Sequence, residues 1–350
     1  MRSLIFLGLC VVLLSACSQS KQPLKLHGPG VERLPDVVWP DPPEQARFRF
    51  AGELVGEDNF LRNEEESVFT KSLKWLAGVF SSKANKIELQ RPQTGLVDSK
   101  GRIIVTDVGQ QALFVFTENQ GLKLWDSATD QLRFVIPIGV VETNSGEFLV
   151  ADAELGAVYR LGQDGQPLGV FAHEELTRPT GLAYDTTNGS LYVADTRSHE
   201  IKVFDENGVL IKHFGGHGET DGMLNAPTHL TVYDGKLYVV DTLNARVQIF
   251  SLEGEFIQSF GRRGLFKGNF VRPKGIAVDS RGIIYVVESY YDHLLVFNQN
   301  HDFLMPIGGS GSGIGQFSLP SGVWVDETGR IFIADMFNGR VLIFEHLGEA

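Results

Sequence analysis

Acidic side chains at near-constant spacing are the first candidates for chemistry in this chain. Each ends a short aliphatic stretch, and successive ones lie 45, 43, 46, 47 and 47 residues apart. Carboxylates brought together in space could bind a metal ion. A functional site should break the symmetry of a repeated fold, however, whereas a structural residue recurs in every copy. We therefore assign no metal site, no cofactor and no catalytic role to these residues. They are Asp107, Asp152, Asp195, Asp241, Glu288 and Asp335.

His229 is one break in this repetition. It lies in Pro227-Thr-His-Leu230, at a position that the other copies fill with glycine. Those glycines are Gly95, Gly139, Gly181, Gly275 and Gly322. A catalytic zinc site needs about three protein ligands, and this position offers a single histidine. His229 is therefore either a tolerated replacement of glycine or a residue at the entrance of a central channel.

Basic residues form a second break. Residues 261–274 contain five Lys or Arg and no acid, whereas the corresponding segment one repeat earlier contains Glu219 and Asp221. On an acidic protein such a segment could receive an anionic partner. Three arginines, one of them within this segment, precede the proline that opens alternate copies, and they either line the channel entrance or pair with nearby turn acids. They are Arg91, Arg178 and Arg272.

Aromatic residues form the third break. Tyr290 and Tyr291 follow Glu288, and Phe337 follows Asp335, in turns expected on the same face as the basic segment. Exposed aromatic side chains beside arginines are typical of protein-binding hot spots. The sequence therefore predicts a partner-binding face. Its candidate residues are Arg262, Arg263, Lys267, Arg272, Tyr290, Tyr291 and Phe337.

Cys17 is the one candidate for covalent modification. Arg2 and the apolar stretch Leu4 to Leu14 form a secretory signal, residues 1–16, that is too short to span a bilayer stably. The sequence Leu14-Ser-Ala-Cys17 closely resembles the bacterial lipobox. That resemblance implies cleavage before Cys17 and its lipidation, and Ser18 resembles the sorting signal of outer-membrane lipoproteins. The alternative is an ordinary signal peptide followed by a chance cysteine.

The acids belong to a repeated pattern of short strands. In the clearest copy, Pro273-Lys-Gly-Ile-Ala-Val-Asp279 precedes Gly282-Ile-Ile-Tyr-Val-Val-Glu288 and then Leu295-Val-Phe297. A period in the forties with four strands per unit is typical of propeller blades. The sequence therefore predicts an all-β, six-bladed and monomeric β-propeller over residues 47–350.

The last copy lacks a fourth strand. It stops six residues after Phe344, whereas residues 47–55 resemble the fourth strand of other copies, such as Glu255-Phe-Ile-Gln-Ser-Phe260. We expect the N-terminal strand to complete the last blade, because closure removes an exposed strand edge.

Two further segments precede the repeats. Residues 17–46, which hold six prolines after residue 17, are expected to form a lipid-anchored tether. Residues 57–90 form an insertion in which apolar residues at helical spacing predict a helix over about 64–81. This helix packs either on the propeller or on the membrane surface beside the anchor.

The charge balance excludes one class of partner. The formal net charge is −12, and removal of residues 1–17, whose only charged side chain is Arg2, leaves −13. Binding of nucleic acid needs a dominant basic surface. We therefore expect no nucleic-acid partner.

The repeat resembles the NHL family. The resemblance rests on Phe260-Gly-x-x-Gly264, on Pro273-x-Gly275-Ile-Ala-Val-Asp279 and on Asp241-Thr-Leu-Asn244-Ala-Arg246-Val-Gln-Ile-Phe250. It covers about residues 91–344, and the second copy is degenerate. It implies that the strand-ending acid holds backbone N–H groups at a turn, together with residues such as Asn244 and Arg246.

The NHL resemblance also implies a function class, since members are mostly recognition platforms and a minority are enzymes. The layout looks like bacterial lipoproteins of this type. We expect a cell-envelope lipoprotein, anchored in the membrane, that binds another envelope protein or a polymer without catalysis. The alternative is a metal-dependent propeller enzyme similar to lactonases or to peptide-amidating lyases, which place metal ligands in the channel.

Overall fold

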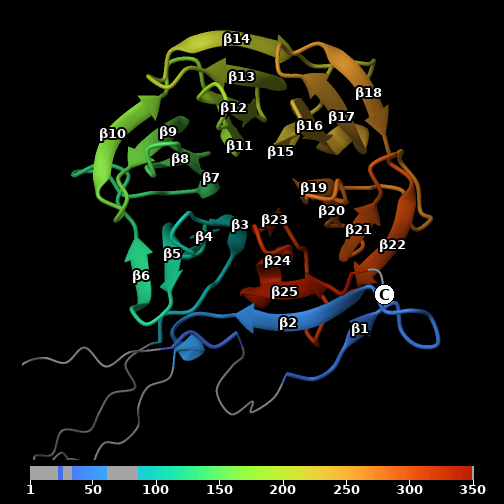
Figure 1. Ribbon diagram of the computed structural model, residues 1–350. Coiled ribbons are helices and arrows are strands. Elements are labelled where there is room, and N and C mark those ends of the chain that lie inside the picture. The colour runs from blue at the N-terminus through green and yellow to red at the C-terminus, as the bar shows by residue number, and fades with distance from the viewer. Residues whose placement is uncertain (1–22, 27–33, 61–85, 349–350) are drawn as a thin grey trace, which may run out of the picture.

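The protein is a closed ring of six antiparallel sheets around a central axis (Figure 1). The computed structural model describes residues 23–26, 34–60 and 86–348. Within these residues the only helical elements are three short 3-10 turns, and no helix is long and apolar enough to cross a membrane. The prediction of an all-β, six-bladed propeller is confirmed. The helix predicted over about 64–81 lies outside the described residues, as does Cys17.

Each of blades one to three contains four strands in sequence order from the axis outward. The aliphatic second strands are buried on both faces, which is why they read as continuous apolar runs in the sequence. Blade one contains β3 (Pro92–Val97), β4 (Ile103–Asp107), β5 (Ala112–Thr117) and β6 (Gly121–Trp125). Blade two contains β7 (Pro137–Glu142), β8 (Phe148–Asp152), β9 (Ala157–Leu161) and β10 (Pro167–Ala172). Blade three contains β11 (Pro179–Asp185), β12 (Ser190–Asp195), β13 (Glu200–Phe204) and β14 (Leu210–Gly215).

Blades four and five repeat this order, and blade four adds a 3-10 turn after its second strand. Blade four contains β15 (Pro227–Tyr233), β16 (Lys236–Asp241), η2 (Thr242–Asn244), β17 (Arg246–Ser251) and β18 (Phe256–Phe260). Blade five contains β19 (Pro273–Val278), β20 (Ile284–Glu288), β21 (His293–Phe297) and β22 (Phe303–Gly308).

The sixth blade joins the two ends of the chain. It contains β23 (Val323–Val325), β24 (Arg330–Asp335), η3 (Met336–Asn338) and β25 (Arg340–His346), and its fourth strand is β2 (Phe48–Leu54). In Figure 1 the blue β2 therefore lies beside the red β25. Phe48, Phe50 and Leu54 pair with His346, Phe344 and Val341 and are at most 4% exposed. The predicted closure by the N-terminal strand is confirmed.

The segment expected to be a tether packs against this blade in its described parts. β1 (Val38–Trp39) adds a fifth strand outside β2, and the Trp39 ring contacts Phe344 edge-on at 5.1 Å between centroids. Farther upstream, the Leu26 carbonyl accepts a hydrogen bond from the Glu53 N–H. This proline-rich segment shows no strand-like alternation of apolar and polar residues, so the sequence alone did not predict the contact. Residue 47 is therefore not where packing begins.

The hydrophobic core lies between blades. Each cluster of buried apolar side chains in the described residues draws from two adjacent blades; for example, one cluster joins Tyr285 of blade five to Ile331 and Phe344 of blade six. Burial of one such side chain stabilises the fold by about 2–3 kcal/mol. The ring is thus held together by contacts that no single blade can make alone.

The strand order creates two distinct faces. Loops between blades and turns between second and third strands share one face, which we call the interblade-loop face. The hairpin turns between first and second strands and between third and fourth strands occupy the other, which we call the hairpin face. The inner strands begin at the interblade-loop face. Their pairing places Thr94, not Gly95, level with Gly139 and His229, because Gly95 pairs with Val105 as Val140 pairs with Val150. In blade one the glycine lies one position farther from the proline than in the other blades, which corrects the alignment above.

Candidate functional site

The six repeated acids are structural clamps. All are at most 1% exposed, and each accepts a hydrogen bond from a backbone N–H in the interblade loop just before its own blade. The acid at the end of the second strand thereby fixes the loop that leads into the first strand. These contacts agree with the role that the NHL resemblance implies, and they orient the loops of the candidate binding face.

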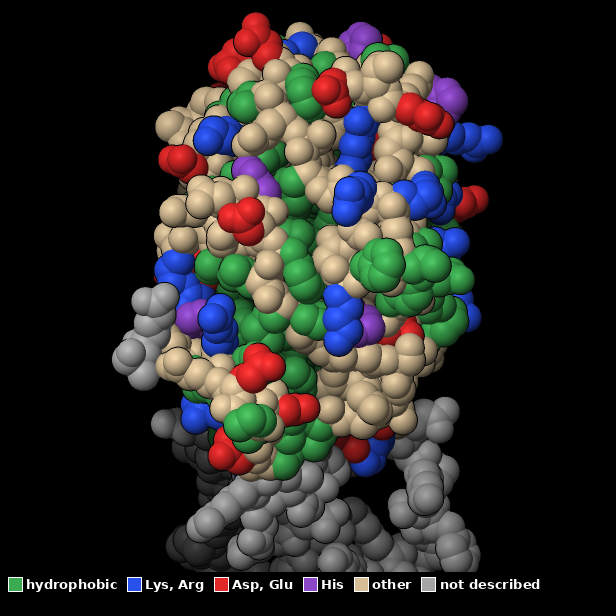
Figure 2. Space-filling model, turned by 90° about the vertical axis from the view of Figure 1, so that its right-hand side faces the viewer, with side chains coloured by type: hydrophobic (Ala, Val, Ile, Leu, Met, Phe, Trp, Pro, Cys, Tyr) green, Lys and Arg blue, Asp and Glu red, His purple; other side chains and the backbone are tan. Residues whose placement is uncertain are grey.

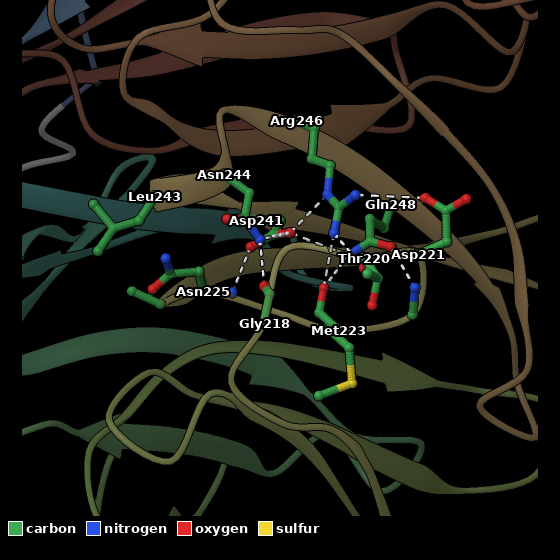
Figure 3. Close-up of polar contacts among 12 residues, drawn as sticks. Gly218, Thr220, Asp221, Met223, Asn225, Asp241, Leu243, Asn244, Arg246 and Gln248 are labelled. Atoms are coloured by element: carbon green, nitrogen blue, oxygen red, sulfur yellow. Dashed lines mark hydrogen bonds and ion pairs between the residues drawn. The ribbon is translucent and has the colours of Figure 1, made fainter.

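Blade four shows the clamp in its fullest form (Figure 3). The Asp241 carboxylate accepts hydrogen bonds from the Asn225 N–H at 2.6 Å, from Asn244 Nδ2 at 2.8 Å and from Arg246 Nε at 2.8 Å. Arg246 also donates to the carbonyl oxygens of Thr220 and Met223. One buried carboxylate thus holds an interblade loop and a turn as a unit, and charge-assisted bonds of this kind are stronger than neutral ones.

Blade five carries a simpler clamp. Glu288 accepts from the backbone N–H groups of Val271, Arg272 and Tyr290. Burial raises the pKa of the Glu288 carboxyl, and the hydrogen bonds that it accepts oppose this rise. Its longer side chain fixes both the loop that bears Arg272 and the turn that bears Tyr290, so two predicted site segments share one anchor.

The predicted basic residues lie together on one loop of the interblade-loop face. Arg262, Arg263, Lys267 and Arg272 are exposed. Arg263 donates to the Leu243 carbonyl at 2.6 Å, which ties the loop to the η2 turn of blade four. Within the part of the chain that the structure describes, no acidic side chain lies within 4 Å of any of these four cations. The charges of Arg262, Arg263 and Lys267 are therefore available to a partner, whereas Arg272 also acts on the buried Glu288 carboxylate.

The predicted aromatic residues occupy turns of the same face. Tyr290 is 57% exposed and meets Tyr291 edge-on, with ring centroids 5.0 Å apart. Phe337, also 57% exposed, lies in η3 of the next blade. Tyr291 is half-buried and lines a pocket of about 220 Å³ together with Lys267. The structure thus brings Lys267 and Tyr291 together, while Phe337 stands apart on the neighbouring blade.

The sequence analysis missed the most exposed apolar side chains of this face. Leu265 and Phe266, which line the same pocket, are 80% and 82% exposed. Leu243 in η2 and Ile314 in the loop before blade six are also exposed. Phe266 lies four residues before Phe270, which is fully buried, and nothing in the local pattern distinguishes the two. Large exposed apolar groups with basic neighbours mark interaction sites.

This arrangement is visible from the side. Figure 2 looks onto the outer strands of blades four and five, and a group of hydrophobic side chains projects at its right-hand edge beside several Lys and Arg side chains. An apolar centre with a polar rim is the usual layout of a protein-binding surface.

The three channel-entrance candidates differ in their surroundings. Arg178 lies 3.8 Å from Glu154 of the neighbouring turn, as expected for an arginine that pairs with a turn acid. Arg91 is exposed and has no acidic partner within 4 Å among the described residues. His229 is only 9% exposed and lines a central cavity of about 190 Å³. In residues 23–26, 34–60 and 86–348, no group of three His, Cys, Asp or Glu side chains could hold a metal ion.

Comparisons with known sequences agree with this geometry. Residues 176–204 match the NHL repeat family, and residues 218–290 and 280–349 match a family described as 6-bladed beta-propeller. A search of curated proteins found no match.

Solved structures with the same fold include several enzymes. Virginiamycin B lyase from Staphylococcus aureus is 15% identical, with a TM-score of 0.55 over 73% of this chain and 80% of that one. A gluconolactonase from Xanthomonas campestris is 15% identical, with a TM-score of 0.58 over 74% and 86%. Kuenenia stuttgartiensis hydrazine synthase is 12% identical, with a TM-score of 0.55 over 78% and 100%. At such identities the similarity shows the fold alone.

Proposed function

We propose that this chain, a six-bladed β-propeller with NHL-type repeats, is a lipid-anchored protein of the cell envelope that binds another envelope protein without catalysis. The interblade-loop face of blades four to six is the binding surface. Cys17 carries the lipid, which the lipobox-like sequence before it supports, and Ser18 after it supports an outer-membrane location. A protein with a lipid anchor and a binding face would hold its partner at the membrane.

One observation carries this proposal. Exposed apolar side chains coincide with cations that form no ion pair within the described residues, on loops that buried acids hold in place. Recognition on rigid scaffolds usually lies in such loops. Because the chain as a whole is acidic, a basic surround on one face gives that face a distinct electrostatic preference for an acidic partner.

The partner's chemistry follows from the surface. The pocket that Phe266 and Tyr291 line suits one aliphatic or aromatic side chain. Lys267 in its wall, and the exposed Arg262 that contacts Asn269 of the wall, suit carboxylates. Aromatic residues and arginine contribute most to protein interfaces. We therefore expect a protein surface in which an apolar anchor lies among acidic residues, rather than a basic or uncharged polymer.

Photocrosslinking in intact cells tests this function. A photoreactive residue at Phe266 should capture a discrete membrane-associated protein, whereas the same residue at Asn207 or Glu253, exposed on the hairpin face, should not. Capture of the same protein from both faces, or of none from Phe266, would remove the basis of the proposal. Capture of a glycan-containing polymer instead would replace the protein partner by a polymer.

A further inference from the structure

A cavity of about 620 Å³ opens on the hairpin face between blades two and three, away from the proposed protein-binding surface. Its wall consists of the β7–β8 turn and strands β8 to β10 of blade two, together with the β11–β12 and β13–β14 turns of blade three. Pockets that bind small organic molecules usually have volumes of about 300–1,000 Å³. The cavity is therefore large enough for such a ligand.

The β7–β8 turn departs from the pattern of three other blades. In blades one, five and six, an aspartate at the start of the corresponding turn accepts a hydrogen bond from an arginine of the same turn. These pairs are Asp98 with Arg102, Asp279 with Arg281, and Asp326 with Arg330. Blade two has Thr143 and Glu147 where blade one has Asp98 and Arg102, and the two form the same backbone hydrogen bond across the turn. A carboxylate thus replaces the usual guanidinium.

In blade one, the arginine of this turn fills the space between blades. The Arg102 guanidinium lies 5.4 Å from the centroid of the Trp125 ring and 5.6 Å from that of Phe148 in blade two. The cavity at the corresponding place between blades one and two has a volume of only about 230 Å³. Glu147 cannot make such a contact, because the face of an aromatic ring repels a carboxylate. The space beside blade two therefore stays open.

Several accessible polar groups in the wall have no protein partner. The hydroxyl groups of Tyr184 and Thr187 and the carboxylate of Glu206 form no hydrogen bond within the described residues. The Glu147 carboxylate lies 3.8 Å from Arg160 Nη1, which is beyond hydrogen-bond distance. Thr187 and Glu206 are exposed, and the Glu147 side chain is 30% exposed, so a ligand in the cavity can reach these groups.

The charges and donors of the wall define the ligand. Glu147 and Glu206 contribute two negative charges, against one positive charge from Arg160. Arg160 is already engaged, since it donates to the Glu206 carbonyl at 2.7 Å and lies 4.9 Å from the centroid of the Phe171 ring. The wall therefore disfavours an anion. Most of its other polar side chains are uncharged amides and hydroxyls such as Asn144, which donate and accept hydrogen bonds. An uncharged ligand with many hydroxyl groups matches this wall.

We infer that this cavity binds a neutral saccharide of one or two rings. Hydroxyl groups of the sugar donate to the Glu147 and Glu206 carboxylates and exchange hydrogen bonds with Tyr184 and Thr187. The site is independent of the proposed protein-binding surface and can exist whether or not that surface has a partner. Asn207 also lines the cavity, so its use as a control on the hairpin face concerns protein binding only.

Calorimetry with matched probes tests the class of ligand. The full-length protein, in a detergent without sugar headgroups, should bind at least one of cellobiose, maltose and lactose at one saturable site. The corresponding aldonate and alditol differ only in a carboxylate or an alcohol at one end, and the aldonate should bind about tenfold more weakly. No saturable binding of any of the three disaccharides at about 20 mM would overturn the inference. Tighter binding of the aldonate, or saturable binding of spermidine alone, would do the same.

Two variants of the wall locate the site. Glu147→Gln keeps the size of the side chain, replaces a charged acceptor by a neutral one, and should weaken binding of the disaccharide about tenfold. Thr187→Val removes one hydroxyl group and should weaken it several-fold. Glu327→Gln, at an exposed residue of the corresponding turn in blade six, is the control and should bind as wild type. Unchanged affinity in both wall variants, or an equal loss in the control, would overturn the assignment of this cavity. If one wall variant does not fold, the other decides.

Discussion

Phe50 of β2 pairs with Phe344 of β25, and the two rings meet edge-on with centroids 6.2 Å apart. They are 4% and 0% exposed. The contact joins a segment near the start of the chain to one near its end. Ring closure therefore depends on side chains that are far apart in sequence, and the sixth blade is complete only when both termini are present.

Removal of this contact should destabilise the whole ring. Phe50→Ala should lower the free energy of unfolding by about 3–5 kcal/mol, the range for a large buried aromatic. Trp39→Ala should cost less, because Trp39 is half-buried on the outermost strand β1. Urea denaturation of both variants measures the difference. If a chain that begins at residue 57 had the same melting temperature as the full-length protein, β2 would not be what closes the ring.

The sequence was sufficient for the ring because its signals are local and repeated. The spacing of the acids, from Asp107 to Asp335, gave the number of blades, and the missing fourth strand of the last copy indicated that residues 47–55 would complete it. β1 could not be predicted, since two residues between prolines carry no periodic pattern. Its position depends on contacts with Phe344 that only the folded ring provides.

His229 should make stability depend on pH. The histidine is buried and neutral, with a pKa lowered to about 3, whereas an unfolded histidine titrates near 6.5. Below pH 6.5 the unfolded state therefore binds the additional proton, and stability falls as the pH decreases towards 3. Between pH 6.5 and 4.5 this contributes a loss of about 2–3 kcal/mol.

His229→Gly should remove that contribution. Denaturation in buffers free of carboxylates measures the free energies of unfolding of the wild type and the variant. As the pH falls from 6.5 to 4.5, the value for the wild type should approach that of the variant or fall below it. A constant difference across this range would mean that His229 does not stay neutral in the folded protein.

Cys17→Ala tests the anchor. The variant cannot be acylated at this position and should move from the membrane pellet to the soluble fraction, since stable anchoring requires more than one acyl chain or a second attachment signal. Fractionation followed by immunodetection measures the shift. Membrane retention of Cys17→Ala with normal processing of the signal would contradict the lipoprotein interpretation.

Charge reversal on the interblade-loop face should act on association rate. Arg262→Glu should slow binding of the captured partner several-fold at low salt and leave dissociation nearly unchanged, because a charge at the rim steers the encounter. The effect should diminish as salt screens it. Arg262 is preferable to Arg263, whose bond to the Leu243 carbonyl also supports the loop. An effect that persists at high salt would point to structural damage instead.

The candidate surface was only partly predictable from the sequence. Its basic residues and tyrosines stood out because they interrupt a repeat, and the structure places Lys267 and Tyr291 around one pocket. Leu265 and Phe266 gave no such signal, since a loop residue carries no periodicity that reports exposure. The burial of the His229 ring nitrogens without a hydrogen-bond partner among the described residues could not be predicted either, because it depends on the folded surroundings of the side chain.

The affinity of the captured partner for two combined variants, one on each face, is the most direct test of the binding face. One variant combines Phe266→Ala, Tyr290→Ala and Phe337→Ala; the other combines Asn207→Ala and Glu253→Ala on the hairpin face. The first variant should weaken binding by at least about 30-fold, mainly through faster dissociation, as expected when apolar anchors are lost. The second should bind as wild type. Retained affinity in the first variant, or equal losses in both, would contradict the assignment of this face.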